Sequence, residues 1–152
     1  MTFSGAITLP TGTVRIDAVT GTVVFNGALN AGTLMATASG YGVQMNGNTT
    51  ITNALTLLNS GGVVLGNGGD VLNFDGGLVS LNSLTTINGT VNTSNDTITL
   101  GSVVIGGNSV IDTDTGAGNL TIASLTAGTS NLTLISGTGT LSLNGAVTGT
   151  GT

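Results

Sequence analysis

The residue pattern with the clearest chemical meaning is Gly66-Asn67-Gly68-Gly69-Asp70-Val71-Leu72. It matches the Gly-x-Gly-x-Asp-x-Leu core of a calcium-binding nonapeptide repeat, in which Asp carboxylates and turn carbonyls from adjacent copies hold the ion. The following Asn73-Phe74-Asp75 is an imperfect second half. Asp70 and Asp75 are therefore the candidate calcium ligands. One copy supplies fewer than the roughly 6 to 8 oxygens that calcium needs, so an ordinary glycine-rich corner is the alternative and no obligatory cofactor is expected.

A second carboxylate pair, Asp112 and Asp114, is the candidate for catalysis. Residues at i and i+2 of an extended strand lie on one face, and paired carboxylates can hydrolyse glycosides. The segment Asp112-Thr113-Asp114-Thr115-Gly116 also has the composition of a solvated turn. Because the chain contains no His, Cys, Lys or Glu, it offers no general base besides Asp and no activated nucleophile. We therefore predict that the protein is not an enzyme.

The charge composition excludes several classes of partner. The formal net charge is −5 and Arg15 is the single basic side chain. Such a surface releases almost no counterions from a phosphate backbone and gains nothing from an anionic membrane surface. No stretch approaches the roughly 18 apolar residues of a membrane span. We therefore expect neither a nucleic-acid partner nor insertion into a membrane. The absence of Cys suits a protein that is exported and folds outside the cell.

The elements that must carry these residues are short β-strands. Apolar residues alternate with Thr, Ser or Asn, which gives each strand one buried and one solvated side. The strands recur about every 9 to 12 residues with no helical window between them. The predicted strands are Ile7–Leu9, Val14–Ile16, Val23–Phe25, Thr33–Met35, Thr50–Thr52, Leu55–Leu57, Val63–Leu65, Val71–Phe74, Leu78–Leu81, Ile98–Leu100, Val103–Ile105, Leu120–Ile122, Leu132–Ile135 and Leu141–Leu143.

This rhythm predicts an all-β fold, a parallel β-solenoid of six or seven coils that forms one domain over residues 1–152. At about 20 to 25 residues a coil and about 4.8 Å between strands, the rod would be on the order of 30 Å long. Asn-Gly pairs such as Asn26-Gly27 and Asn46-Gly47 are also typical of hairpins, so an antiparallel β-sandwich is the alternative.

Recurrent asparagines near the corners have two interpretations. They could form hydrogen-bonded ladders between coils, or they could be turn residues that tolerate left-handed backbone geometry. The asparagines concerned are Asn26, Asn46, Asn73, Asn88, Asn119, Asn131 and Asn144. Both interpretations give them a structural role.

The carboxy-terminal third resembles a known group of proteins. The segments Gly118-Asn119-Leu120-Thr121-Ile122, Ser130-Asn131-Leu132-Thr133-Leu134 and Gly139-Thr140-Leu141-Ser142-Leu143-Asn144-Gly145 are similar to coils of filamentous-haemagglutinin-like and autotransporter passenger proteins, which are bacterial surface adhesins. The resemblance implies a right-handed parallel β-helix, an extracellular or cell-surface location and a wider role in adhesion.

We therefore expect a non-enzymatic structural rod of an extracellular surface filament or adhesin. No capping element is visible near either end of the solenoid pattern, so we expect its ends to associate with other copies as a homo-oligomer or filament. Host or surface glycans are further candidate partners. The alternatives are a trimeric phage or viral fibre shaft and a carbohydrate-binding or carbohydrate-degrading β-helix.

Overall fold

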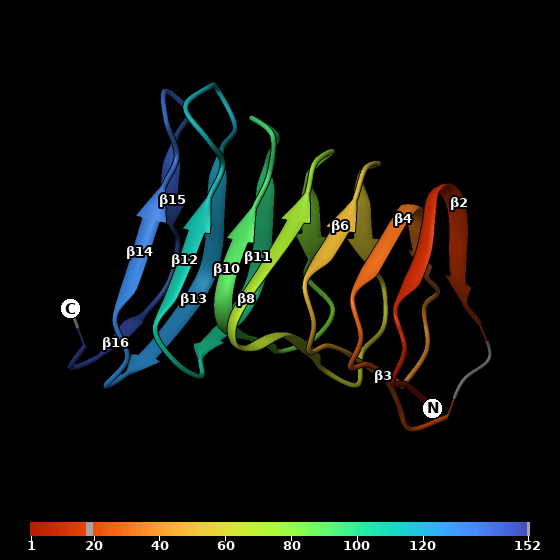
Figure 1. The fold of residues 1–152 in the computed structure, drawn as a ribbon. Helices are drawn as coiled ribbons and strands as arrows, with labels where there is room; N and C mark the ends of the chain where they lie inside the picture. Colours follow the sequence, from red (N-terminus) through yellow and green to blue (C-terminus); the bar gives the residue numbers. More distant parts are fainter. Residues whose placement is uncertain (18–19, 152) are drawn as a thin grey trace.

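The protein is a parallel β-solenoid of about seven turns. The computed structural model describes residues 1–17 and 20–151, and this part of the chain contains strands, turns and bends but no helix. It accordingly has no helix that could cross a membrane. Every described strand pair is parallel, so the fold predicted from the alternating pattern is confirmed and the antiparallel sandwich is wrong. Figure 1 shows the strands lying side by side from the N-terminal to the C-terminal coil.

The strands form three ladders, here called faces A, B and C, which each coil visits in that order. The strands confined to face A are β1 (Thr2–Phe3), β3 (Thr22–Phe25), β5 (Gly42–Met45) and β16 (Val147–Gly149). Those confined to face B are β6 (Thr49–Ile51), β12 (Ser109–Asp112) and β14 (Leu132–Ile135). Those confined to face C are β7 (Leu55–Leu57), β9 (Leu78–Ser80) and β15 (Leu141–Leu143).

Six longer strands bend around a corner and contribute to two faces. The strands β2 (Ile7–Ile16) and β4 (Leu29–Ala36) pass from face B to face C. The strands β8 (Val63–Phe74) and β10 (Thr85–Asn92) pass from face A to face B. The strands β11 (Ile98–Ile105) and β13 (Leu120–Gly128) pass from face C to face A.

The repeat length varies from coil to coil. Register partners on adjacent coils are 18 residues apart between Thr85 and Val103 and 23 apart between Ser109 and Leu132. Because the length varies at the corners while the ladders stay in register, insertions are absorbed without moving the core.

The core consists of columns of stacked apolar side chains. On face A, Phe25, Met45 and Leu65 are register partners in successive coils, and each is at most 1% exposed. On face B, Ile51 pairs with Phe74, and both side chains are completely buried. The period-two alternation directs these residues inward and their Thr, Asn and Gln neighbours outward, which is why so few charges suffice to cover the surface.

Close approach between coils explains several corner glycines. A Cβ on Gly27 would collide with the backbone carbonyl of Gly5, and one on Gly47 would meet the carbonyl of Gly27. Neither Gly27 nor Gly47 has a positive φ. The close stacking of the coils, and not a left-handed backbone angle, is therefore what requires glycine at these two positions.

The corner asparagines form short ladders instead of one continuous one. Asn46 donates to Asn26 Oδ1 at 2.9 Å, and Asn92 donates to Asn73 Oδ1 at 3.1 Å. Asn119 instead accepts the backbone N–H of Thr140 at 2.8 Å. None of the seven predicted asparagines has a positive φ, which among described non-glycine residues occurs at Asn95 and Asp114. The ladder interpretation therefore holds for Asn26, Asn46 and Asn73, and the left-handed one for none of the seven.

The corners that precede the face A strands β5 and β8, in adjacent coils, each hold one buried polar side chain. Tyr41 and Asn59 are both 0% exposed. The Asn59 amide donates to the carbonyls of Tyr41 at 3.2 Å and Gly62 at 2.9 Å, and so ties adjacent coils together. The Tyr41 hydroxyl has no hydrogen-bond partner among the described residues. Tyr41 is thus a core aromatic, and its hydroxyl costs stability.

Replacing Tyr41 with phenylalanine should raise the free energy of unfolding by about 1 kcal/mol near neutral pH, because it removes a buried unpaired hydroxyl. Burial is the main cause that raises the pKa of the Tyr41 phenol; the nearby Thr37 acts against this shift, and the negative Asp17 adds to it. The folded state therefore keeps its proton when the unfolded state loses it. Stability is fully present below about pH 10 and falls as pH rises above it.

The part of the alkaline loss that Tyr41→Phe removes can be assigned to Tyr41, because it is the single Tyr of a chain with no Cys and no Lys. Urea unfolding at pH 7 and at about pH 11 should show a fall in the natural protein and a smaller one in Tyr41→Phe. An equal fall in both proteins would contradict the assignment.

Candidate functional site

Asp70 lies at the corner of β8 between faces A and B. Gly66, Gly68 and Gly69 have φ values of 83°, 113° and 81°, a conformation that favours glycine. The Asp70 carboxylate accepts the backbone N–H of Asn67 at 2.9 Å and closes this turn. The calcium-like motif therefore forms a tight corner in which its carboxylate already has a hydrogen-bond partner.

Asp75 lies at the next corner, between faces B and C. Its backbone N–H donates to Ile51 O at 2.9 Å. Residues 71–74 of β8 separate the two aspartates, and five residue steps of extended strand span about 16 Å. Within residues 1–17 and 20–151 no group of three or more acidic, His or Cys side chains is placed to hold a metal ion. The structure thus does not bring Asp70 and Asp75 together, and a shared calcium site stays a prediction.

We expect millimolar calcium and a chelator to give melting temperatures within about 1 °C of each other, because a site with so few ligands adds little to the folding free energy. Thermal unfolding followed by circular dichroism measures this. A strong rise with calcium that is abolished in Asp70→Asn, and not in the control Asp17→Asn, would show that the corner binds the ion.

Asp112 and Asp114 accept hydrogen bonds from backbone groups of their own corner. The Asp112 carboxylate accepts the backbone N–H of Asp114 at 2.7 Å, and the Asp114 carboxylate accepts that of Thr115 at 2.7 Å. Asp114 has a φ of 68°. The buried Thr113 hydroxyl donates to Gly118 O at 2.7 Å and fixes the loop from inside. These contacts form the turn that the segment's composition predicted as one of its two interpretations.

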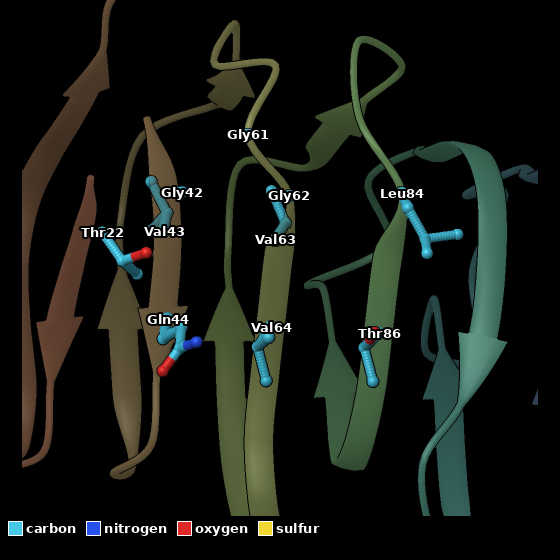
Figure 2. A pocket seen from close by; sticks show the side chains of 10 residues that line it. All are labelled: Thr22, Gly42, Val43, Gln44, Gly61, Gly62, Val63, Val64, Leu84 and Thr86. Atoms are coloured by element: carbon cyan, nitrogen blue, oxygen red, sulfur yellow. The ribbon is translucent and has the colours of Figure 1, made fainter. Parts of the chain in front are cut away.

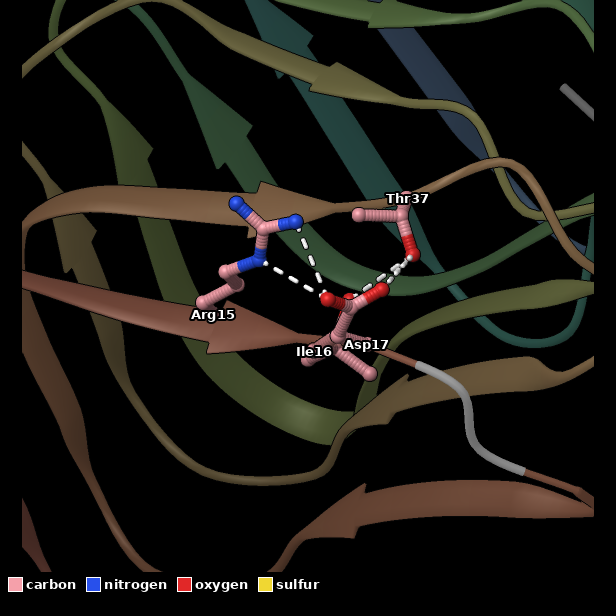
Figure 3. Close-up of polar contacts among 4 residues, drawn as sticks. All are labelled: Arg15, Ile16, Asp17 and Thr37. Atoms are coloured by element: carbon pink, nitrogen blue, oxygen red, sulfur yellow. Dashed lines mark hydrogen bonds and ion pairs between the residues drawn. The ribbon is translucent and has the colours of Figure 1, made fainter.

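The single basic side chain lies in the first coil. Arg15 donates to Asp17 Oδ2 from Nε at 3.1 Å and from Nη2 at 2.9 Å, and Thr37 of the next coil also contacts this carboxylate (Figure 3). The side chains of Arg15 and Asp17 are 56% and 55% exposed. An exposed pair of this kind contributes at most about 1 kcal/mol, and it provides no basic groove for an anionic sugar chain.

A shallow hollow lies on the outer side of face A. Gly42 and Gly62 occupy adjacent outward positions in register, so no side chain fills the space between Thr22 on one side and Leu84 on the other (Figure 2). Gln44, Val64 and Thr86 line its length. Its volume is about 130 Å³. The hollow combines two hydroxyls and one amide with apolar walls, but it holds no titratable group that could catalyse a reaction.

The C-terminal end of the solenoid is its most distinctive surface. The inward-directed Leu141 and Leu143 of β15 are 43% and 39% exposed, and Val147 of β16 is 55% exposed. An apolar cavity of about 200 Å³ opens there, lined in part by Leu125, Ala127, Leu132, Leu134 and Leu143. The outer edges of β14, β15 and β16 have no strand paired to them in the described structure. This end therefore exposes both core side chains and unpaired backbone groups.

The N-terminal end is the other edge of the described solenoid. Here β1 and β2 form the edge, and the Phe3 ring stacks on Phe25 with centroids 5.2 Å apart. Phe3, Ile7 and Val14 are only partly buried, and Leu9 is 45% exposed. The sequence pattern did not indicate the end cavity or the Phe3–Phe25 pair, because both depend on which coil a residue occupies.

Comparison of the chain with protein-family models, with curated proteins and with solved structures gave no match. The β-solenoid fold is thus established by the strand pairing alone, and no family is assigned.

Proposed function

We propose that this protein is a non-enzymatic structural rod that lengthens by end-to-end association in an extracellular filament or adhesin shaft. An uninterrupted column of buried side chains through the coils supports a load-transmitting role. The sparse charge and the lack of Cys support a location outside the cell. Binding of surface glycans by such a rod stays a prediction.

The observation that carries the proposal is the exposed core at the C-terminal coil. Leu141 and Leu143 have the alternation of buried strands, yet about two fifths of each side chain is exposed. Their register partners one coil earlier, Leu120 and Ile122, are completely buried because another coil covers them. An added coil would bury these leucines and pair the free edge of β15.

The other end of a second copy can supply that coil. Val14 and Ile16 of β2 point inward on face C, where they would follow Leu141 and Leu143 in the same column. Ile7 would likewise follow Leu134 on face B. Because both ends keep the apolar-in, polar-out alternation, a head-to-tail contact continues the core without placing a charge in it.

Replacing Leu141 with lysine should weaken association. In a single molecule the substitution is tolerated because the side chain is 43% exposed. In the assembly it would bury a charge and lose about 1.5–3 kcal/mol of apolar burial, which raises the dissociation constant at least tenfold. Sedimentation velocity and electron microscopy over a concentration series measure this.

The matched control is Thr56→Lys, which adds the same charge to an exposed, outward position at the middle of face C. It should associate as the natural protein does. A natural protein that stays monomeric at high concentration would overturn the proposal, and a trimer that does not grow further would favour the fibre-shaft alternative.

A further inference from the structure

The three faces of the described solenoid do not carry equal numbers of strands. Face A carries eight strand segments, from β1 to β16, whereas faces B and C carry seven each. The extra segment is β16, since β15 already completes the seventh coil. A head-to-tail pair that kept both β1 and β16 would therefore leave one strand position empty on face B and one on face C.

All three ladders become continuous if one of the two face A strands gives up its place. Either β1 of the incoming copy replaces β16 on β13, or β16 replaces β1 on β3 of the incoming copy. In a junction that kept both β1 and β16, the backbone groups that face the empty positions on faces B and C would stay unpaired, which is costly inside an interface.

The contacts favour release of β16. All three of its residues are exposed, and the contact between the hydroxyls of Thr148 and Thr126 at 3.3 Å joins its side chains to β13. By contrast, Phe3 of β1 is half-buried and stacks on Phe25. The N-terminal ammonium also donates to Thr22 O at 2.7 Å, and Phe3 O accepts the N–H of Asn26 at 2.8 Å.

The end cavity fits the incoming strand. Phe25, Met45, Leu65, Ile87 and Ile105 form one core column of face A. Thr126 pairs with Val104, so the next position in this column is Ala127, whose small side chain lines the cavity. Phe3 is the first member of the same column, because it pairs with Phe25. Placed on β13, Phe3 of a second copy would lie over Ala127 and fill the cavity with its ring.

From this geometry we infer that β16 is a displaceable cover, and that β1 of a second copy takes its place on β13 when the rods join. The inference rests on the end-to-end association proposed above and names the strand that makes the junction. In register, Thr2 of the incoming copy then pairs with Thr126.

Cysteine pairs in the otherwise cysteine-free full chain test the junction. Thr2→Cys with Thr126→Cys should form intermolecular disulfides, since neighbouring outward positions on adjacent strands lie within the range of a disulfide. Thr2→Cys with Thr148→Cys would crosslink only if β1 stacked on a retained β16. Val24→Cys with Thr148→Cys would crosslink only if β16 displaced β1. Crosslinking of either of these pairs in preference to the first overturns the inference.

A second measurement does not depend on disulfides. Since β16 leaves the junction, Val147→Lys should not weaken association, whereas Leu141→Lys raises the dissociation constant at least tenfold. Equal weakening by the two substitutions overturns the inference while leaving end-to-end association intact. Failure of the unsubstituted chain to associate, with no crosslink from any pair, overturns both.

Discussion

Replacing Phe74 with alanine is expected to lower the free energy of unfolding by about 3–5 kcal/mol. Phe74 is completely buried in the fourth of seven coils and follows Ile51 in its core column. The substitution removes the ring and leaves a cavity between coils whose strands are paired in register, so the site has little freedom to collapse.

The position of Phe74 adds to this effect. In a solenoid each coil contacts only its neighbours, and a weakened coil in the middle uncouples the two halves of the stack. Urea unfolding at a concentration where the protein is monomeric measures the loss.

Phe3→Ala is the matched control, because it deletes the same side chain from the half-buried end coil. It should cost about 1 kcal/mol, which is the burial of part of one ring. Equal costs for the two substitutions would mean that the end coil is packed as tightly as the centre, and would contradict the open end described above.

The sequence predicted strands best where apolar residues are dense. Val63–Leu65 and Leu120–Ile122 were expected and are present in β8 and β13. The strand β5 was not predicted, because Gly42 and Gln44 face outward and leave Val43 and Met45 as its apolar signal. A strand of this kind is recognisable only from its partners in the coils before and after it.

The open end could not be located from local pattern. Leu141 and Leu143 alternate with polar residues as Leu120 and Ile122 do, yet the first pair is exposed and the second buried. Burial in a solenoid depends on the coil stacked above, which no short window contains. For the same reason the sequence did not indicate that Phe3 and Ala127 occupy one core column, since this column passes through every coil.

Corner glycines show a further limit of local inference. An isolated Gly-Gly or Asn-Gly pair indicates a turn, but it does not tell which glycine the fold requires. At the corner between faces C and A, a Cβ on Gly61 would collide with the backbone of Gly40 and Tyr41, whereas a Cβ on Gly40 would meet no atom within 4 Å. Neither glycine has a positive φ.

Gly61→Ala is therefore expected to lower the free energy of unfolding by about 3 kcal/mol, the upper part of the range for an overpacked site. The backbone cannot withdraw, because Gly61 N–H donates to Tyr41 O at 3.0 Å and Asn59 holds the same carbonyl. Gly40→Ala carries the same loss of freedom in the unfolded chain and no collision, so it should be neutral or stabilise by about 0.4–1 kcal/mol. Urea unfolding of the two variants separates collision from backbone entropy. If Gly61→Ala and Gly40→Ala were equally stable, the coils would not be in the close contact that places Gly61 against Gly40.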